Sequence, residues 1–170
     1  MKVTIFKDVK STKAPHHIQL ATALSRIQRG KSKDLIHEIR EGNKEKKLEL
    51  PVVCFSGEFS SRADEALFEH SGYIVLDFDH VDVEATKTAL ATDDYIYACW
   101  VSPSGDGIKA LVRITNPERH RDHFRALTAY LSRQHGLEVD ETGINESRAC
   151  FESYDPDIII KDDYKRFGHF

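Results

Sequence analysis

The stretch Tyr73-Ile74-Val75-Leu76-Asp77-Phe78-Asp79-His80 is an apolar run that ends in two carboxylates two residues apart. Successive side chains of a strand point to opposite faces, so a strand here places Asp77 and Asp79 on one face, expected to be open, and the alternating apolar residues on a core face. Two carboxylates at this spacing are hard oxygen ligands of the kind that Mg²⁺ and Mn²⁺ take. In a more ordinary interpretation, Asp79 forms a turn or caps a helix that starts near Val83.

The order of elements after this strand predicts the fold. The patterns indicate a strand at 73–79, a helix at 83–90, strands at 95–102 and 108–114 that form a hairpin, a helix at 118–135 and a strand at 148–154. The order strand, helix, strand, strand, helix, strand is typical of ferredoxin-like folds, which RNA-recognition domains also use. We therefore predict an α/β protein of the α+β type, with an RRM-like (ferredoxin-like) unit over about residues 73–154.

Residues 1–72 are expected to form an N-terminal subdomain of helices and strands within one domain, 1–170, whose RRM-like unit extends to about residue 160. The patterns predict strands at 2–7 and 50–56 and helices at 18–29, 35–41 and 62–70. The basic segment 43–47 is expected to be a solvated loop or a contact to a phosphate backbone.

Composition excludes several classes of protein. The 170 residues are enough for one well-buried core, and a formal charge of -4 argues against binding of nucleic acid by bulk charge alone. The three cysteines, Cys54, Cys99 and Cys150, form no CxxC pair, which favours reduced thiols and a cytoplasmic location. No apolar run has the length of a signal peptide core or a membrane span, so no membrane partner is expected.

A candidate site follows from the usual arrangement of such a fold, in which the third and fourth strands flank the first. Lys109 would then start the third strand and Arg148 the fourth, both beside the end that carries Asp79. Asp140, just before the fourth strand, would add a third carboxylate. Acids with a lysine and an arginine around them are typical of metal-assisted phosphoryl transfer. Taken separately, the two bases are ion-pair partners of the acids, and Asp140 opens a turn with Gly143.

The turn at 102–107 contains small residues, among them Ser104 and Gly105, and its backbone N–H groups can cradle a phosphate. The turn does not match a Walker A loop, because Lys109 leads into a strand rather than a helix.

These residues resemble the catalytic domain of the archaeo-eukaryotic primase superfamily, the primase-polymerases. More narrowly, they resemble the N-terminal domain of virulence-associated-E-type replication proteins of phages, prophages and plasmids. The family's hydrophobic strand ending in Asp-x-Asp is matched by 75–79, its hydrophobic residue before an acid by Val139-Asp140, and its arginine strand by 147–151. The resemblance extends from about Leu50 onward. Lys109 stands where the family normally has a histidine that contacts the nucleotide's phosphates.

The resemblance implies template-directed nucleotidyl transfer, by a DNA primase or polymerase that adds a dNTP or NTP to a 3'-hydroxyl. The catalytic residues and ligands for two Mg²⁺ or Mn²⁺ ions would be Asp77, Asp79 and Asp140. The nucleotide-binding residues would be Ser104, Gly105, Lys109 and Arg148. The implied partners are a DNA template and primer and a helicase in cis or in trans, in a bacterial host of a mobile element. The segment up to Lys47 would help to hold the template.

Two alternatives stay open. Lys109 preserves a positive charge for a phosphate, or it marks a nucleic-acid-binding replication module that has lost turnover. The run Asp77-Phe78-Asp79-His80-Val81 also fits the opening motif of haloacid-dehalogenase-like phosphatases, in which Asp77 is a nucleophile. That motif normally opens a parallel, doubly wound sheet, whereas a hairpin is expected here.

Overall fold

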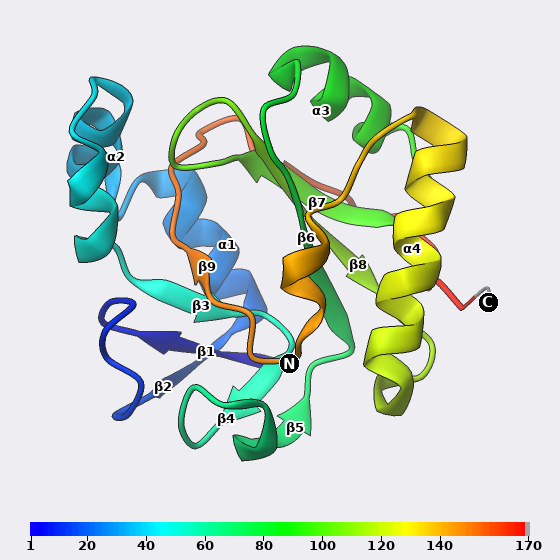
Figure 1. Ribbon diagram of the computed structural model, residues 1–170, viewed down its shortest axis with the longest axis horizontal. Coiled ribbons are helices and arrows are strands. Elements are labelled where there is room, and N and C mark those ends of the chain that lie inside the picture. Colours follow the sequence, from blue (N-terminus) through cyan, green and yellow to red (C-terminus); the bar gives the residue numbers. More distant parts are fainter. Residues whose placement is uncertain (169–170) are drawn as a thin grey trace.

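The computed structural model describes residues 1–168 and combines helices with antiparallel sheets, so the predicted α+β class is confirmed (Figure 1). One sheet has the order β2-β1-β3-β9, a second the order β10-β7-β8-β6, and a third pairs β4 with β5. The strands are β1 (Lys2–Phe6), β2 (His16–Gln19), β3 (Val52–Cys54), β4 (Gly57–Phe59), β5 (Leu67–His70), β6 (Tyr73–Phe78), β7 (Ile96–Val101), β8 (Ile108–Arg113), β9 (Cys150–Phe151) and β10 (Ile159–Ile160). The helices are α1 (Leu20–Arg29), α2 (Lys33–Arg40), α3 (Val83–Ala91) and α4 (His120–His135), with 3₁₀ helices η1 (Lys44–Glu49), η2 (Asp64–Ala66), η3 (Pro117–Arg119) and η4 (Glu141–Ile144).

The strand that carries the Asp-x-Asp motif, β6, pairs antiparallel with β8, and Asp77 lies opposite Lys109. β8 forms the predicted hairpin with β7. Ile74, Leu76 and Phe78 share one apolar cluster with residues of α3 and α4, which cover this face of the sheet (Figure 1). The predicted alternation of side chains along β6 is therefore confirmed.

The opposite face of this sheet was expected to be open, and that expectation is wrong. Tyr73, Val75 and Leu111 on this face pack against α1 and the N-terminal sheet, in a cluster that also contains Trp100. This face is covered because apolar residues lie between the charged ones on β6 and β8, and a strand that is apolar on both faces is buried on both. Only the end of the strand that carries Asp77 stays polar on this side.

The last predicted strand also differs from expectation. The residues of β9 do not pair with β6; Val52 and Val53 of β3 lie opposite Phe151 and Cys150. The β6 edge of the second sheet is therefore not extended by β9, and its other edge is completed by β10 beside β7. The chain after η4 thus crosses from the second sheet back to the first.

The predicted helix at 62–70 is wrong. This segment forms the short η2 and then β5, which pairs with β4. The spacing of Ala63, Ala66 and Leu67 fits a helix, but Leu67 and His70 lie opposite Phe59 and Gly57 in an antiparallel ladder. Pairing with a neighbouring strand has overridden the local pattern. The segment at 43–47, expected as a loop, lies in part within η1.

A pair of histidines, the partly buried His70 and the buried His120, joins β5 to the start of α4. His70 Nε2 lies 3.0 Å from His120 Nδ1, and His70 Nδ1 accepts a hydrogen bond from the Gly72 N–H at 2.8 Å. Burial, with a smaller contribution from the charge of His120, lowers the pKa of His70 from 6.5 to about 4. Glu146 acts in the opposite direction and is outweighed.

We expect this pair to make the fold acid-sensitive. Between about pH 6.5 and about pH 4 the unfolded chain binds a proton at residue 70 while the folded chain does not, so stability falls as the pH falls through this interval. The loss approaches about 3 kcal/mol. In His70→Asn, whose side-chain oxygen can still accept from Gly72, urea unfolding at pH 7.5 and pH 5 should differ less than in the wild type. The exposed His16 supplies the control: His16→Gln should keep the wild-type difference, and an unchanged difference in His70→Asn would contradict the assignment.

Two further expectations concern the whole chain. Cys54, Cys99 and Cys150 are all free and buried, as the absence of paired spacings predicts. Within residues 1–168, none of the helices combines the length and the apolar character needed to cross a lipid bilayer.

Candidate functional site

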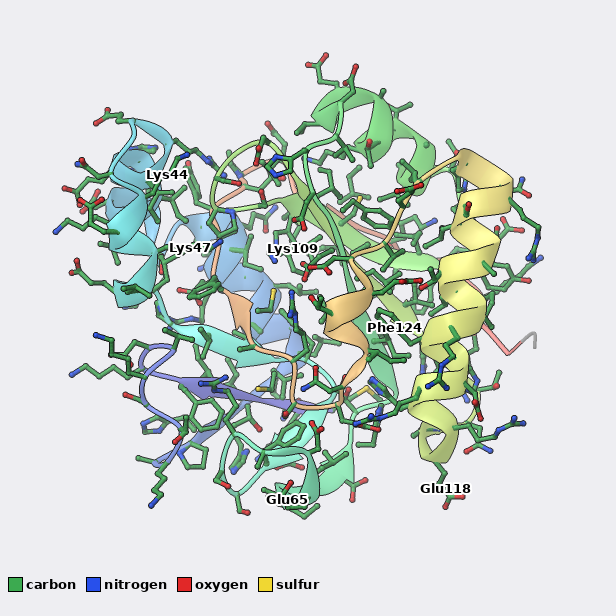
Figure 2. All side chains as sticks on the ribbon, in the orientation of Figure 1. Lys44, Lys47, Glu65, Lys109, Glu118 and Phe124 are labelled. Atoms are coloured by element: carbon green, nitrogen blue, oxygen red, sulfur yellow. The ribbon has the colours of Figure 1, made fainter. Side chains whose placement is uncertain are left out.

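A polar cleft of about 480 Å³ lies where the two larger sheets meet at the Asp77 end of β6. One side comes from the N-terminal part of the chain and the other from β6, β8 and the segment around η4 and β9. Figure 2 shows Lys47, from η1, and Lys109, from β8, among the side chains of this region. The lining residues are Val9, Lys47, Arg62, Asp77, Asp79, Lys109, Asp140, Asn145, Ser147, Arg148, Ala149 and Phe151.

Asp77 is the buried centre of the cleft, with only 7% of its surface exposed. Its Oδ1 atom accepts a hydrogen bond from Lys109 Nζ at 2.6 Å, and its Oδ2 atom accepts one from Arg148 Nη2 at 3.2 Å. Burial opposes ionisation, but Lys109 and Arg148 together outweigh it and hold the pKa of Asp77 below its ordinary value. The same burial opposes the charge on Lys109, yet the Cys150 sulfur and the Asp77 carboxylate keep the pKa of Lys109 above its ordinary value. Asp77 and Lys109 are thus a charged pair at neutral pH.

Asp140 is held beside Asp77 by the backbone. The Asp140 N–H donates to the Asp77 carbonyl at 2.8 Å, and Arg148 Nη2 bridges the two carboxylates, 3.3 Å from Asp140 Oδ2. The other oxygen of Asp140 caps η4 by accepting from the Thr142 N–H and hydroxyl. The Gly143 N–H also donates to the Asp140 carbonyl, so the residue opens the expected turn and lines the cleft at once.

Asp79 lines the same cleft but is exposed, and within residues 1–168 its carboxylate has no hydrogen-bond or ion-pair partner. Its alternative role as a helix cap is wrong. The cap of α3 is Asp82, whose side chain accepts from the Ala85 N–H. Asp79 is therefore the carboxylate most open to a ligand.

The donor chemistry of the cleft fits a divalent cation, because three carboxylates line it, two from the end of β6 and one from the segment before η4. The carboxylates are, however, already engaged with cationic side chains: both oxygens of Asp77 and one of Asp140 contact Lys109 or Arg148. In the part of the chain that the structure describes, no three His, Cys, Asp or Glu side chains are gathered closely enough to hold a metal as they lie. A metal would need Arg148 to turn toward another acceptor.

The turn at 102–107 does not contribute to the cleft lining. Ser104 is exposed and donates a hydrogen bond to Asp106, while Gly105, at φ +85°, lies against the Arg40 side chain of α2. A Cβ atom at Gly107 would lie 2.8 Å from the Phe78 carbonyl oxygen. The glycines thus serve the turn's conformation and its close packing on the end of β6, so the structure does not bring Ser104 and Gly105 to the three acids.

The N-terminal side of the cleft contains two cations that sequence analysis only partly anticipated. Lys47 belongs to the basic segment noted above, and its ammonium lies 5.0 Å from the centre of the Phe151 ring. Arg62 is a single arginine, between Ser61 and Ala63, in a segment predicted to be a helix, so no sequence pattern identified it as a site residue. It is anchored by one side-chain hydrogen bond, from Nη2 to the Val9 carbonyl at 2.5 Å.

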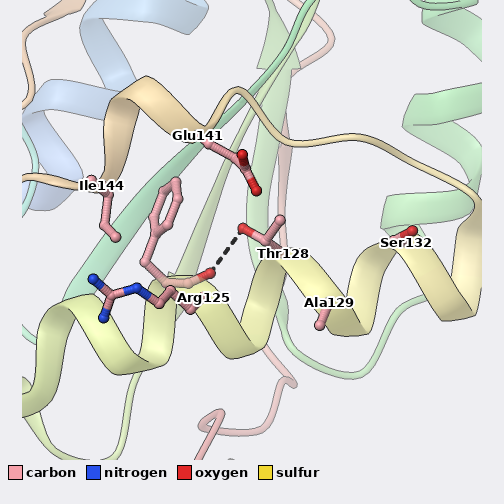
Figure 3. Close-up of a pocket in the computed structure, with 7 residues that line it drawn as sticks. Arg125, Thr128, Ala129, Ser132, Glu141 and Ile144 are labelled. Atoms are coloured by element: carbon pink, nitrogen blue, oxygen red, sulfur yellow. Dashed lines mark hydrogen bonds between the residues drawn. The ribbon is translucent and has the colours of Figure 1, made fainter.

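Two further hollows lie between α4 and the segment around η4. Figure 3 shows one of them, with Glu141 pointing toward Thr128. The hollow in the figure, of about 540 Å³, is also lined by Arg125 and Ile144, and the Thr128 hydroxyl donates to the Phe124 carbonyl. It contains one carboxylate and one guanidinium, and lacks the convergence of charges seen around Asp77.

Comparison with known proteins gives one match. The family model described as BT4734-like, N-terminal domain, matches residues 45–159. No curated protein and no solved structure matches the chain. The matched segment contains every lining residue of the cleft except Val9.

Proposed function

The chain belongs to the family of BT4734-like N-terminal domains, and we propose that this member catalyses template-directed nucleotidyl transfer, as a DNA primase or polymerase does. The observation that carries the proposal is the meeting of Asp77, Asp79 and Asp140 with Lys109 and Arg148 in one cleft. These residues come from three segments that are distant in the sequence. A set of carboxylates next to fixed cations is what metal-assisted transfer of a phosphoryl group requires.

In this proposal the three carboxylates hold Mg²⁺ or Mn²⁺. When bound, these ions lower the pKa of a primer 3'-hydroxyl and stabilise the departing pyrophosphate. Lys109 and Arg148 bind the triphosphate of the incoming dNTP or NTP. Arg148 must change partners for this reaction, because without a nucleotide its guanidinium bridges Asp77 and Asp140. A triphosphate offers it bidentate acceptors that compete with these carboxylates.

The proposal includes the partners that such a reaction needs: a DNA template and primer, and a helicase in cis or in trans. It places the domain in the cytoplasm of a bacterial host, in the replication of a mobile element. The three free, buried thiols support a reducing compartment.

The test is primer extension by the wild-type chain, with a labelled primer, a template of defined sequence, single dNTPs and Mg²⁺ or Mn²⁺. We expect incorporation of the nucleotide complementary to the template, and no incorporation without the metal. Replacement of dNTPs by NTPs in the same assay measures sugar preference. Absence of templated incorporation under all of these conditions would overturn the proposed activity.

A second candidate is a nucleic-acid-binding replication module without turnover. The observation that favours it is the pairing of Asp77, whose two oxygens are both neutralised by buried or half-buried cations. Such a module would bind template and nucleotide in the same assay without extending the primer. The phosphatase alternative is less well supported, because its motif normally opens a parallel sheet, whereas the ladders between the named strands are all antiparallel.

A further inference from the structure

We propose that Arg62 and Lys47 form a second anion site in the cleft, which binds a phosphodiester of single-stranded DNA next to the triphosphate site. This inference rests on the proposed nucleotidyl transfer for the identity of the strand, and on the charges of the cleft for the existence of the site. Neither residue belongs to the groups assigned above to the metal ions and the triphosphate, and Lys47 ends the segment that the resemblance assigns to the template.

Arg62 has donors without protein acceptors. A guanidinium carries five N–H donors, and the only side-chain hydrogen bond of Arg62 within residues 1–168 is the one from Nη2 to Val9. Its Nε atom is buried and unpartnered, and the Nε atom of Arg148 in the same cleft is too. A buried donor left unsatisfied costs about 1–3 kcal/mol. Arg62 as a whole is only partly buried and lines the cleft, so an anion there can supply acceptors to its guanidinium.

The balance of charges indicates the sign of the ligand. Asp77 is matched by Lys109, and Asp140 shares Arg148 with it. Arg62 and Lys47 form no ion pair with a carboxylate in the described part of the chain, and Lys47 lies over the Phe151 ring instead. The N-terminal side of the cleft therefore carries two cations without ion-pair partners, against the one unpaired carboxylate of Asp79 at the end of β6, and this excess of positive charge favours a phosphate.

The position of the site indicates a strand rather than a second mononucleotide. Arg62 and Lys47 come from the N-terminal part of the chain, whereas Lys109 and Arg148 come from β8 and the segment before β9. When Lys109 and Arg148 bind the incoming nucleotide, the N-terminal side of the cleft stays available to bind the neighbouring phosphates of the DNA. Arginine and lysine contacts of this kind track a backbone without reading its sequence.

The experiment is fluorescence anisotropy with a labelled single-stranded oligonucleotide, without nucleotide or metal, at several salt concentrations. For Lys47→Met/Arg62→Met we expect at least about tenfold weaker binding, and a salt slope reduced by about 0.7 for each lost phosphate contact. Binding of a dNTP with Mn²⁺, measured by calorimetry, should change less than about twofold, which is less than about 0.4 kcal/mol. The matched control is Arg133→Met/Lys165→Met, which removes one exposed arginine and one exposed lysine outside the cleft and should bind like the wild type.

Arg62→Lys keeps the charge and should keep the salt slope, which separates a phosphate contact from a loss of folding. Unchanged oligonucleotide binding in the double variant would overturn the inference, as would a wild-type chain that binds no oligonucleotide. A loss confined to dNTP binding would overturn it as well, because the site would then serve the triphosphate. Since this assay needs no turnover, a chain that fails to extend primers would refute the proposed function and leave the result on Arg62 and Lys47 intact.

Discussion

Primer extension by Asp77→Asn/Asp79→Asn is expected to fall at least about a thousandfold, a loss of about 4 kcal/mol in transition-state stabilisation. Each substitution keeps the size of the side chain and removes the negative charge that a divalent cation needs. Asp77 is the buried, charged member of the pair, and Asp79 is exposed in the same cleft. Steady-state incorporation of a single dNTP measures the effect.

The matched control removes the same two charges elsewhere. Asp162 and Asp163 are adjacent, exposed and outside the cleft, so Asp162→Asn/Asp163→Asn should extend primers as the wild type does. Oligonucleotide binding by the Asp77→Asn/Asp79→Asn variant should stay measurable, because Arg62 and Lys47 are untouched. Wild-type extension by that variant would show that the carboxylates of β6 take no part in catalysis.

The second large effect concerns stability. Lys109→Met is expected to destabilise the fold by about 3 kcal/mol, because it leaves the Asp77 carboxylate buried with Arg148 as its remaining partner. In this variant the pKa of Asp77 should rise, since the opposite charge that lowers it most is gone. Urea unfolding at pH 7.5 measures the loss.

The double change Asp77→Leu/Lys109→Met removes both charges and should recover most of that stability, because apolar side chains can replace a buried ion pair at little cost. The recovered variant should still fail to extend primers. That combination would separate a role in folding from a role in the reaction. Equal destabilisation by Lys109→Met and by the double variant would mean that the Asp77 carboxylate, left without Lys109, costs the fold nothing, contrary to the expectation for a buried charge.

The parts of the fold that were predictable are those with a strong local period. The apolar run of β6 predicted a strand, the turn residues between β7 and β8 predicted a hairpin, and the spacing of Phe124, Leu127 and Leu131 predicted a helix and its buried face. Alternation along β6 and β8 also placed Lys109 on the same side as Asp77, and the register of the two strands puts them directly opposite each other. Local pattern was enough here because both partners lie in one continuous ladder.

The parts that were not predictable depend on partners far along the chain. A strand of two residues, β9, carries no signal for whether it pairs with β3 or β6, and the choice of β3 was decided by packing of Ala149 and Phe151 on an apolar cluster of the N-terminal sheet. Arg148 nevertheless reaches Asp77 from that sheet, because its long side chain spans the gap. The role of Arg62 could not be predicted for a similar reason. Its neighbours in the cleft are distant in the sequence, and it lies beside them only once β4 and β5 have paired.

The chain runs from η4, beside the second sheet, to β9, which pairs with β3 in the first sheet, and this crossing limits how the molecule can be divided into fragments. Asp77 is carried by one sheet, while Arg148 is set two residues before a strand of the other. A fragment that began at residue 73 would retain both side chains but lose the ladder that sets one against the other. The site therefore lies between the two larger sheets, and any rotation of one sheet relative to the other would change the distance between Asp77 and Arg148.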